Sequence, residues 1–391
     1  MKRYLTYLLA MISAAFLMTA CSQKAEEKAS EASADTKKET VASETIRIGV
    51  PGAHSGDLAS YGLPTVNAVK LYVEEVNKNG GINGKMVELF IEDDACKPEL
   101  ATNTANKLVA NKVVAVIGHT CSGPTKAALN IYKDAKIVVM SPSATDPLLT
   151  SKGEYPNFAR SIAPDDAQAK LQTELALDKL GAKKIAILHD KGDYGKGLAE
   201  YARTFIQQDG KGAEVVLFEG ITVGAVDYSA VVQKIARSGA DAVLFGGYHP
   251  EASKIVTQLR KKQNKVPFIS ADGVKDDMFI RVAGEYAEGV YATGPTDTTN
   301  NPINIKAVED HRTVFGTEPG AFFINGYTSI MAVLNAIEKA NSTEYEAVNN
   351  ALRTEYVETP FGNISYDEKG DAIGIGFTVY QVQNGAYVEL D

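Results

Sequence analysis

The sequence lacks the positive charge that nucleic-acid-binding proteins carry. Its 391 residues include 40 Lys and Arg against 49 Asp and Glu, which gives a formal net charge of −9 at pH 7. Binding to phosphates needs a basic patch, so we expect no nucleic acid partner. The same shortage of basic residues argues against a polybasic contact with a membrane surface.

Catalytic and cofactor motifs are also missing. The chain has no G-x-S-x-G and no Walker A sequence, and its glycines at 192, 195 and 197 do not follow the dinucleotide-binding order. His54 stands beside Ser55, but no third group is evident to orient the imidazole. The five histidines have no metal-ligand spacing; they are His54, His119, His189, His249 and His311. We therefore expect no enzyme, no cofactor and no metal site.

A long hydrophobic run occurs only at the start of the chain. Two basic residues precede the mostly apolar segment 4–18, and small residues then lead to Cys21. This pattern predicts a signal peptide over residues 1–20, and the run is too short for a typical membrane span. Cys21 resembles the lipidated cysteine of a bacterial lipobox, although Met18 replaces the usual Leu. An ordinary signal peptidase site is the alternative.

Residues 22–44 have a composition that disfavours folding. They are rich in Ala, Glu, Lys, Ser and Thr, with no aromatic residue and one Val. Such a segment cannot bury enough apolar surface to order itself, so residues 21–44 are predicted to be a flexible, lipid-anchored tether. A docked helix is the alternative, since Ala, Glu and Lys favour helix, but no apolar stripe is present.

From Thr45 the chain alternates strand and helix patterns, and the alternation restarts after Pro164. Continuous Val and Ile runs between helices indicate parallel sheets buried on both faces. We therefore predict an α/β fold of two doubly wound parallel-sheet lobes joined by a hinge of three crossings. The predicted lobes are residues 45–163 with 296–371 and residues 164–295 with 372–391, with crossings near Ala163-Pro164, Pro295 and Asp371-Ala372. Ligands of such folds bind at the carboxyl ends of the strands, here between the lobes.

The loops after the strands hold residues suited to a free amino acid. Ser122, an expected helix N-cap, and the hydroxyls of Ser143 and Thr145 would suit a carboxylate. Asp272, in the opposite lobe, would suit an ammonium group. Four aromatic residues could form apolar walls: Tyr61, Tyr194, Tyr248 and Phe322. Plain helix capping by Ser122, an Asx turn at Asp272 and simple packing of each aromatic ring are the alternatives.

Several stretches together resemble the Leu/Ile/Val-binding proteins, which are type I periplasmic binding proteins. The resemblance covers nearly all of residues 45–391. It is carried by Asp93-Asp94-Ala95-Cys96, Val116 to Thr125, Ser141 to Thr145, His189 to Gly195, Gly220-Ile221-Thr222, Gly246 to Glu251 and Asp367 to Asp371. It implies an extracytoplasmic protein that binds a branched-chain or other aliphatic amino acid for an ABC importer.

The resemblance also implies roles for single residues. The implied ligand-binding residues are Tyr61, Cys121, Ser122, Ser143, Ala144, Thr145, Tyr194, Tyr248, Asp272 and Phe322. Asp272 stands where the family usually has Glu, and Thr120 stands where a larger apolar residue is common. The resemblance further implies a disulfide between Cys96 and Cys121, with two free thiols as the alternative. Its loop length corresponds to roughly 3–4 kcal/mol of stabilisation by chain entropy.

The expected partners follow from this family likeness. We expect an amino acid ligand, an ABC transporter permease, membrane contact only through the lipid at Cys21, and a monomer. The expected location is the periplasm or the cell surface of a bacterium. The competing interpretations are the same fold bound to another small amino acid or amide, and a sensory or chemotaxis subunit that acts on a receptor.

Overall fold

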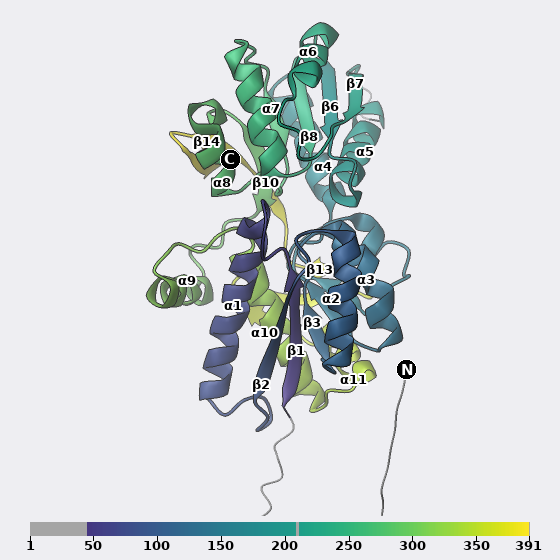
Figure 1. Ribbon diagram of the computed structural model, residues 1–391, viewed down its shortest axis with the longest axis vertical. Helices are drawn as coiled ribbons and strands as arrows, with labels where there is room; N and C mark the ends of the chain where they lie inside the picture. Colours follow the sequence, from purple (N-terminus) through teal and green to yellow (C-terminus); the bar gives the residue numbers. More distant parts are fainter. Residues whose placement is uncertain (1–44, 209–210, 391) are drawn as a thin grey trace, which may run out of the picture. The chain divides into compact units, whose positions relative to one another are not determined.

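The computed structural model describes residues 45–208 and 211–390. The predicted signal peptide (residues 1–20), the lipidation site Cys21 and the predicted tether (residues 21–44) lie outside the described residues. From Thr45 onward, strands and helices alternate as the sequence predicts, and Figure 1 shows them gathered around two separate sheets.

The first sheet has five parallel strands in the order β2-β1-β3-β4-β5. Its strands are β1 (Ile46–Gly52), β2 (Val87–Asp93), β3 (Ala115–Ile117), β4 (Val138–Ser141) and β5 (Phe158–Arg160). The helices connecting them are α1 (Ala59–Lys78), α2 (Pro98–Ala110) and α3 (Ser122–Asp134), and a 3-10 turn η1 (Pro147–Leu149) precedes β5. We call this sheet and its helices the first lobe.

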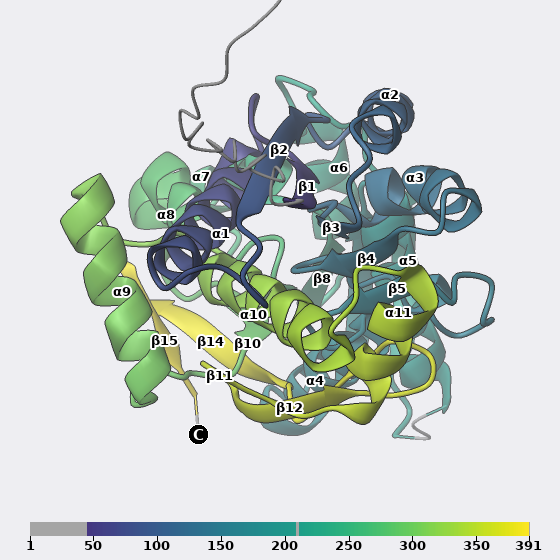
Figure 2. The same cartoon turned by 90° about the horizontal axis from the view of Figure 1, so that it is seen from below.

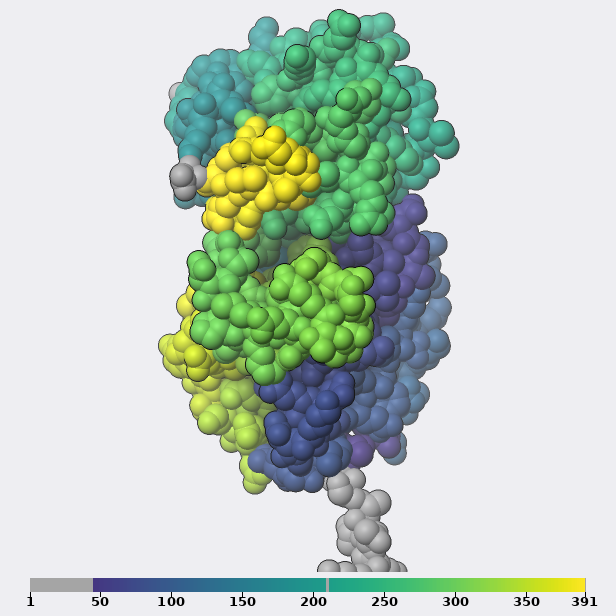
Figure 3. All heavy atoms as spheres, turned by 90° about the vertical axis from the view of Figure 1, so that its left-hand side faces the viewer, coloured from purple at the N-terminus to yellow at the C-terminus, as the bar shows by residue number. Residues whose placement is uncertain are grey.

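The second sheet has seven strands in the order β15-β14-β10-β9-β8-β6-β7. Its strands are β6 (Lys184–His189), β7 (Glu214–Gly220), β8 (Ala242–Gly246), β9 (Phe268–Ser270), β10 (Tyr291–Pro295), β14 (Phe377–Gln383) and β15 (Ala386–Glu389). The strands β14 and β15 join antiparallel at one edge. In Figure 3 these C-terminal strands, in yellow, form part of the surface of what we call the second lobe.

Helices cover both faces of the second sheet. They are α4 (Asp165–Glu174), α5 (Asp193–Gln208), α6 (Ser229–Ser238), α7 (His249–Lys261) and α8 (Asp277–Ala283), with a π-helical turn η2 (Leu175–Lys179) after α4 and a 3-10 turn η3 (Gly284–Ala287) after α8. Alternate residues of β8 face opposite ways: Leu244 packs in the cluster that holds α4 and α5, and Phe245 in the one that holds α6 and α7. This two-sided burial explains the continuous apolar runs of the strands.

Three more helices and a small sheet return to the first lobe. They are α9 (Pro302–Phe315), α10 (Phe323–Ala340), α11 (Tyr345–Thr354), and the antiparallel strands β11 (Val357–Thr359), β12 (Gly362–Tyr366) and β13 (Ala372–Ile373). Figure 2 shows α1 and α10 on one side of the first sheet and α2 and α3 on the other. In β3, Ile117 belongs to the core under α1 and α10, whereas Val116 packs with α2 and α3.

Three segments connect the two sheets, as the predicted hinge requires. They are residues 161–164 between β5 and α4, residues 296–301 between β10 and α9, and residues 374–376 between β13 and β14. The third lies slightly beyond the expected position at Asp371-Ala372, because Ala372 and Ile373 pair with β12. Apart from these three connections, the exact residue boundaries predicted for the two lobes stay a prediction.

The start of α1 differs from the sequence prediction. Proline is common in the first turn of a helix, so the sequence predicts a helix over residues 64–79, whereas the helix begins at Ala59 and Pro64 lies inside it. Proline lacks an N–H group, so the position that it occupies in the second turn has no donor for the helical ladder. The additional first turn carries Tyr61, which is buried between the lobes.

Arg160, at the end of β5, is fully buried and connects three parts of the first lobe. Its guanidinium donates to Asp371 Oδ1 at 2.6 Å, to Thr150 Oγ1 at 2.7 Å, and to the carbonyl oxygens of Ala144 and Asp146 at 3.2 and 2.9 Å. Because all of these acceptors share one side chain, the loop after β4 is held against the segment before the third crossing.

Arg160→Met should therefore destabilise the protein strongly. It leaves the Asp371 carboxylate without its charged partner and the carbonyl oxygen of Ala144 without its donor, a loss on the order of 3 kcal/mol in the free energy of unfolding. Denaturant unfolding followed by circular dichroism measures it. The control is Arg312→Met, which removes an exposed pair with Glu318 and should leave the midpoint nearly unchanged. Equal midpoints for both variants would contradict the role of Arg160.

Candidate functional site

The residues predicted from the strand-end loops converge on one cavity between the lobes. Eight of the ten line it: Tyr61, Cys121, Ser122, Ser143, Tyr194, Tyr248, Asp272 and Phe322. Thr120 and Gly273 complete the lining. The other two predicted residues, Ala144 and Thr145, are buried in the same loop as Ser143 but do not line the cavity.

The cavity is small in this arrangement of the lobes. Its volume is about 20 Å³, which is enough for about one water molecule. A free amino acid is several times larger, so its entry requires the lobes to separate or the lining side chains to move.

The first lobe contributes hydroxyl groups whose hydrogen-bonding capacity is only partly used. Ser143 Oγ donates to the carbonyl oxygen of Thr120 at 2.7 Å, so its lone pairs can still accept. Ser122 Oγ accepts from the N–H of Asp146 at 3.2 Å, which leaves its hydrogen available for another acceptor. Thr145 Oγ1 is buried without a hydrogen-bond partner.

The expected capping role of Ser122 is wrong. Helix α3 begins at Ser122 itself, Cys121 occupies the N-cap position, and no side chain caps the helix. Because the hydroxyl of Ser122 is bonded to the loop after β4, it cannot cap its own helix. The N–H groups of the first turn of α3 are therefore not satisfied by a capping side chain at the edge of the cavity.

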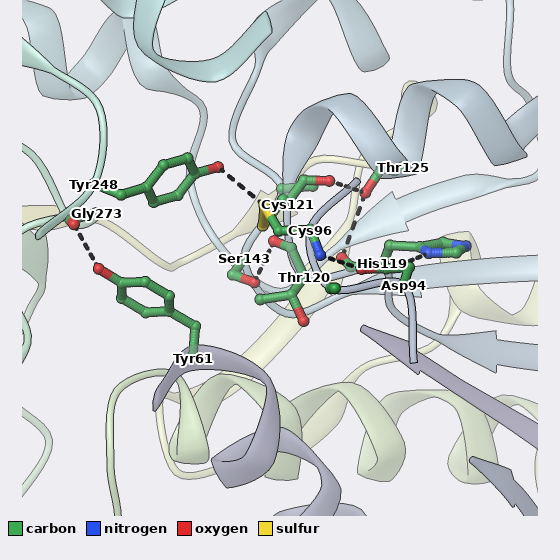
Figure 4. The surroundings of a disulfide bond; sticks show 12 residues. Tyr61, Asp94, Cys96, His119, Thr120, Cys121, Thr125, Ser143, Tyr248 and Gly273 are labelled. Atoms are coloured by element: carbon green, nitrogen blue, oxygen red, sulfur yellow. Dashed lines mark hydrogen bonds and ion pairs between the residues drawn. A yellow bond between two sulfur atoms is a disulfide. The ribbon is translucent and has the colours of Figure 1, made fainter. Parts of the chain in front are cut away.

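A disulfide and a buried hydrogen bond between Asp94 and His119 join the loops beside the cavity, and Figure 4 shows both. Cys96 and Cys121 are bonded to each other, as the resemblance implies. Beside them, Asp94 Oδ2 lies 2.5 Å from Nδ1 of His119, and both side chains are fully buried. Asp94 Oδ1 also accepts from the N–H of Cys96 at 2.7 Å. The loops after β2 and β3 are thus joined twice, once covalently and once through His119.

The second lobe contributes a carboxylate and the groups that hold it. Tyr194 donates to Asp272 Oδ1 at 2.7 Å and accepts from the N–H of Gly273 at 3.0 Å. Asp272 is 3% exposed, and its Oδ2 has no hydrogen-bond partner. Burial raises the pKa of Asp272, and the bond from Tyr194 offsets part of that rise. No Asx turn accounts for this residue, because its side chain bonds to Tyr194 rather than to a following N–H.

Aromatic rings close the remaining side of the cavity. The ring of Tyr61 lies 5.9 Å from that of Tyr248 and 5.7 Å from that of Phe322, and Tyr194 lies 5.1 Å from Tyr248. Phe322 holds a backbone φ of 60°, an uncommon conformation for a bulky residue, directly before α10. The predicted apolar wall is therefore present as one contiguous group of rings.

Tyr61 also ties the lobes together. Its hydroxyl lies 2.6 Å from the carbonyl oxygen of Gly273 and 2.7 Å from Nδ1 of His249, both in the second lobe. A carbonyl can only accept, so Tyr61 gives its one hydrogen to Gly273 and receives a hydrogen from His249. Burial lowers the pKa of His249, which favours the neutral imidazole with its hydrogen on Nδ1.

A second interlobe contact lies at the surface. Lys126 of α3 donates to Asp193 of α5 at 2.7 Å, beside a groove of about 260 Å³ that shares Cys121, Tyr194 and Tyr248 with the cavity. Both side chains are about 40% exposed, so solvent screens the pair and its contribution to closure is small.

Three further residues beside the cavity do not stand out in the sequence: His249, Asp165 and Gln168. None of the three lines the cavity itself. Gln168 is fully buried and accepts from the N–H of Asp272 at 3.1 Å. The run Pro164-Asp165-Asp166 is typical of a helix N-terminus, and this local explanation conceals a buried residue, Asp165, whose N–H bonds to Thr145 of the first lobe.

Two further features bear on the class of protein. No group of three His, Cys, Asp or Glu side chains within residues 45–208 and 211–390 is arranged to hold a metal ion. Among the helices of the described ranges, none combines the length and apolarity needed to cross a bilayer.

Comparison with known sequences gives a consistent family. The profile of the family described as "Periplasmic binding protein" matches residues 45–386. A leucine-, isoleucine-, valine-, threonine- and alanine-binding protein of Pseudomonas aeruginosa is 35% identical over 342 residues, which cover 88% of this chain and 91% of that protein. The Leu/Ile/Val-binding protein of Escherichia coli is 34% identical over 337 residues, with coverages of 86% and 90%.

Solved structures agree with this likeness. A leucine-binding protein, LivK, of Thermotoga maritima superposes with a TM-score of 0.82 at 27% identity, over 89% of this chain and 98% of that one. The branched-chain amino acid transporter substrate-binding protein LivJ of Streptococcus pneumoniae, in complex with isoleucine, gives 0.78 at 29% identity, over 89% and 100%. The predicted two-lobed α/β fold is therefore confirmed.

Removing the disulfide should lower stability. Its 25-residue sequence separation corresponds to a loss of about 3–4 kcal/mol in the chain-entropy account. We expect the Cys96→Ala/Cys121→Ala variant to melt at a lower temperature than the wild type in calorimetry. Reductant should lower the melting temperature of the wild type and leave that of the variant unchanged; equal melting of both proteins without reductant would contradict the bond.

Proposed function

We propose a function on the premise that this chain belongs to the periplasmic binding protein family: it binds one free aliphatic amino acid between its lobes for an ABC importer. Branched-chain amino acids (leucine, isoleucine or valine) are the proposed ligands. The observation that carries the proposal is Asp272 Oδ2, a buried carboxylate oxygen without a hydrogen-bond partner at the wall of the interlobe cavity.

A buried carboxylate is costly unless a cation or hydrogen-bond donors neutralise it. None of the ion pairs found among the described residues involves Asp272, and Tyr194 satisfies only Oδ1. An α-ammonium group has the charge and the three donors that this position needs. Asp272 is thus the proposed ammonium contact, in the position where the family usually has Glu.

The first lobe supports binding of the α-carboxylate. Ser122 has a hydroxyl hydrogen available, and the N-terminus of the 13-residue helix α3 presents N–H groups and a positive partial charge. Ser143 lies across the same cavity with lone pairs available for the ammonium. The opposite charges of the ligand therefore meet complementary groups on the two lobes.

The ring cluster of Tyr61, Tyr194, Tyr248 and Phe322 supports an apolar ligand side chain. Burying one such side chain contributes about 1.5–3 kcal/mol. A smaller aliphatic amino acid, such as alanine, is the second candidate, because the cavity has a volume of only about 20 Å³. The name of the Pseudomonas relative includes branched-chain amino acids as well as alanine.

Closure is part of the proposed mechanism. The ligand enters while the lobes are apart and binds first to the loops that carry Ser122 and Ser143. The second lobe then covers it, and the bonds from Tyr61 to Gly273 and from His249 to Tyr61 form. The closed arrangement is what the permease is proposed to recognise.

The remaining cellular features are proposals from the sequence. They are export to the periplasm or cell surface, lipid attachment at Cys21 after removal of residues 1–20, a tether over residues 21–44, and a monomeric state. Mass spectrometry of the membrane-extracted protein tests the lipid, because a diacylglyceryl group adds a defined mass to the mature N-terminus.

The function is tested by calorimetric titration of the soluble body, from Glu44 onward, with each common amino acid. The protein is first unfolded and refolded to remove any ligand that co-purifies. We expect one-to-one binding of leucine, isoleucine or valine, and Asp272→Asn should raise Kd by roughly 30-fold or more, about 2 kcal/mol.

The matched control is Asp276→Asn, which removes the same charge four residues away. Asp276 caps α8 through the N–H of Met278 and does not line the cavity, and Asn caps equally well. Its Kd should stay within about threefold of the wild type. Binding of none of the amino acids by the wild type would contradict the function, and equal affinities of the two variants would contradict the role of Asp272.

A further inference from the structure

We propose that Asp165 is a second carboxylate beside the ammonium subsite, and that Asp165 and Asp272 together retain one proton until the ligand's ammonium group displaces that proton into solvent. This inference rests on the proposed function and adds a residue and a charge balance to it. One carboxyl O–H bond of the pair breaks on binding, the proton passes to the buffer, and the ammonium replaces its positive charge.

Asp165 does not line the cavity, but it is buried beside it, unlike an acidic residue on the surface of a helix. It opens α4 at the first interlobe crossing, is 0% exposed, and its N–H donates to the carbonyl oxygen of Thr145 at 2.9 Å. Its Oδ2 is buried without a hydrogen-bond partner, as is Asp272 Oδ2. Two buried carboxylate oxygens thus lack a donor, and an ammonium group can supply N–H groups to both.

Gln168 links the two carboxylates. Its Nε2 donates to Asp165 Oδ1 at 2.9 Å, while its Oε1 accepts from the N–H of Asp272 at 3.1 Å and from Thr293 Oγ1 at 2.6 Å. All of these side chains are buried. One amide therefore holds Asp165, the loop of Asp272 and the strand before the second crossing in a single network.

The groups around the pair provide little positive charge. From β5, Arg160 acts on Asp165, but its Nε is already bonded to Asp371. From α5 and the loop before α7, Tyr194 and Tyr248 are neutral phenols whose pKa values are raised by burial first and then by nearby carboxylates. The charge of Asp166, the next residue of α4, is not among the main influences on Asp165. Two negative charges on Asp165 and Asp272 would therefore be poorly neutralised, which favours retention of a proton.

The directions in which the pKa values of the two carboxyl groups are shifted agree with this geometry. Burial raises the pKa of Asp165, and the neighbouring charge of Asp272 raises it further, against smaller opposing effects of Thr145 and Gln168. Burial likewise raises the pKa of Asp272. Two such groups titrate as a pair, in which the second proton leaves at a much higher pH than the first.

This charge balance sets the direction in which ligand affinity depends on pH. The ligand's positive charge favours the doubly ionised pair, so binding lowers the pKa of the pair and releases a proton. The affinity should then rise with pH up to the pKa of the pair in the free protein. For the free protein, the raised carboxyl pKa means that stability falls as pH rises from the unfolded-state value towards the folded-state value.

Calorimetry in buffers of different ionisation enthalpy measures the released protons directly. The refolded wild-type body is titrated with leucine, or with whichever amino acid it binds, at several values between about pH 5 and pH 8. We expect the observed enthalpy to vary linearly with the buffer's ionisation enthalpy, and the slope to approach one released proton at a pH within this range.

Asp165→Asn should abolish the release while binding persists. Its amide keeps an acceptor for Gln168 and leaves Asp272 without a like-charged neighbour, so the variant loses the pair of carboxyl groups that retains the proton. Asp166→Asn is the matched control, because it removes the same charge from the same first turn of α4. This control should release as many protons as the wild type, which a general effect on helix charge would not allow.

The possible results distinguish a failure of this inference from a failure of the proposed function. A wild type that binds an amino acid without exchanging protons at any of these pH values would overturn the inference alone. So would release that persists in Asp165→Asn, since the proton would then come from another group such as His249. A wild type that binds no amino acid would instead remove the function on which the inference depends.

Discussion

The structure depends on one electrostatic constraint, the burial of the Asp272 carboxylate between two lobes with only half of it hydrogen-bonded. Burial makes such a group costly unless a positive charge or hydrogen-bond donors reach it, and the ammonium group of the proposed ligand would supply both. The fold supplies this arrangement, because the strands of both sheets end at the interlobe cavity. A loop of the second lobe can therefore present a carboxylate to the hydroxyl groups of the first.

The other parts of the site hold the loops of the first lobe in place and connect them to the second lobe through contacts that can break. In the first lobe, the Cys96–Cys121 disulfide and the His119–Asp94 pair join the loops beside the cavity, and Arg160 fixes the loop after β4. Between the lobes, the contacts include the hydrogen bonds of Tyr61, the bond from the N–H of Asp165 to Thr145, and the exposed Lys126–Asp193 pair. Hydrogen bonds and exposed ion pairs of this kind can form and break as the lobes close and open around a ligand.

The sequence predicted the two βα series and the strand-end loops well, because buried parallel strands read as continuous apolar runs. Eight of the ten predicted ligand residues line the cavity, although their contacts with a ligand remain proposals. Local patterns misled elsewhere: Ser122 looked like a cap, and Pro64 looked like the start of a helix. Asp165 and Gln168 do not stand out in the sequence because a helix N-terminus explains them locally, whereas Gln168 bonds to residues more than 100 positions away and Asp165 bonds through its N–H to Thr145 of the other lobe.

The most direct measurement of the central claim is a crystal structure of the refolded protein with leucine bound. The account predicts the ligand's ammonium nitrogen at about 2.7–3.0 Å from Asp272 Oδ2, its carboxylate at Ser122 and the first turn of α3, and Tyr61 bonded to Gly273 across the closed lobes. A ligand bound in the reverse orientation, with its carboxylate facing Asp272, or bound outside the interlobe cavity, would contradict it.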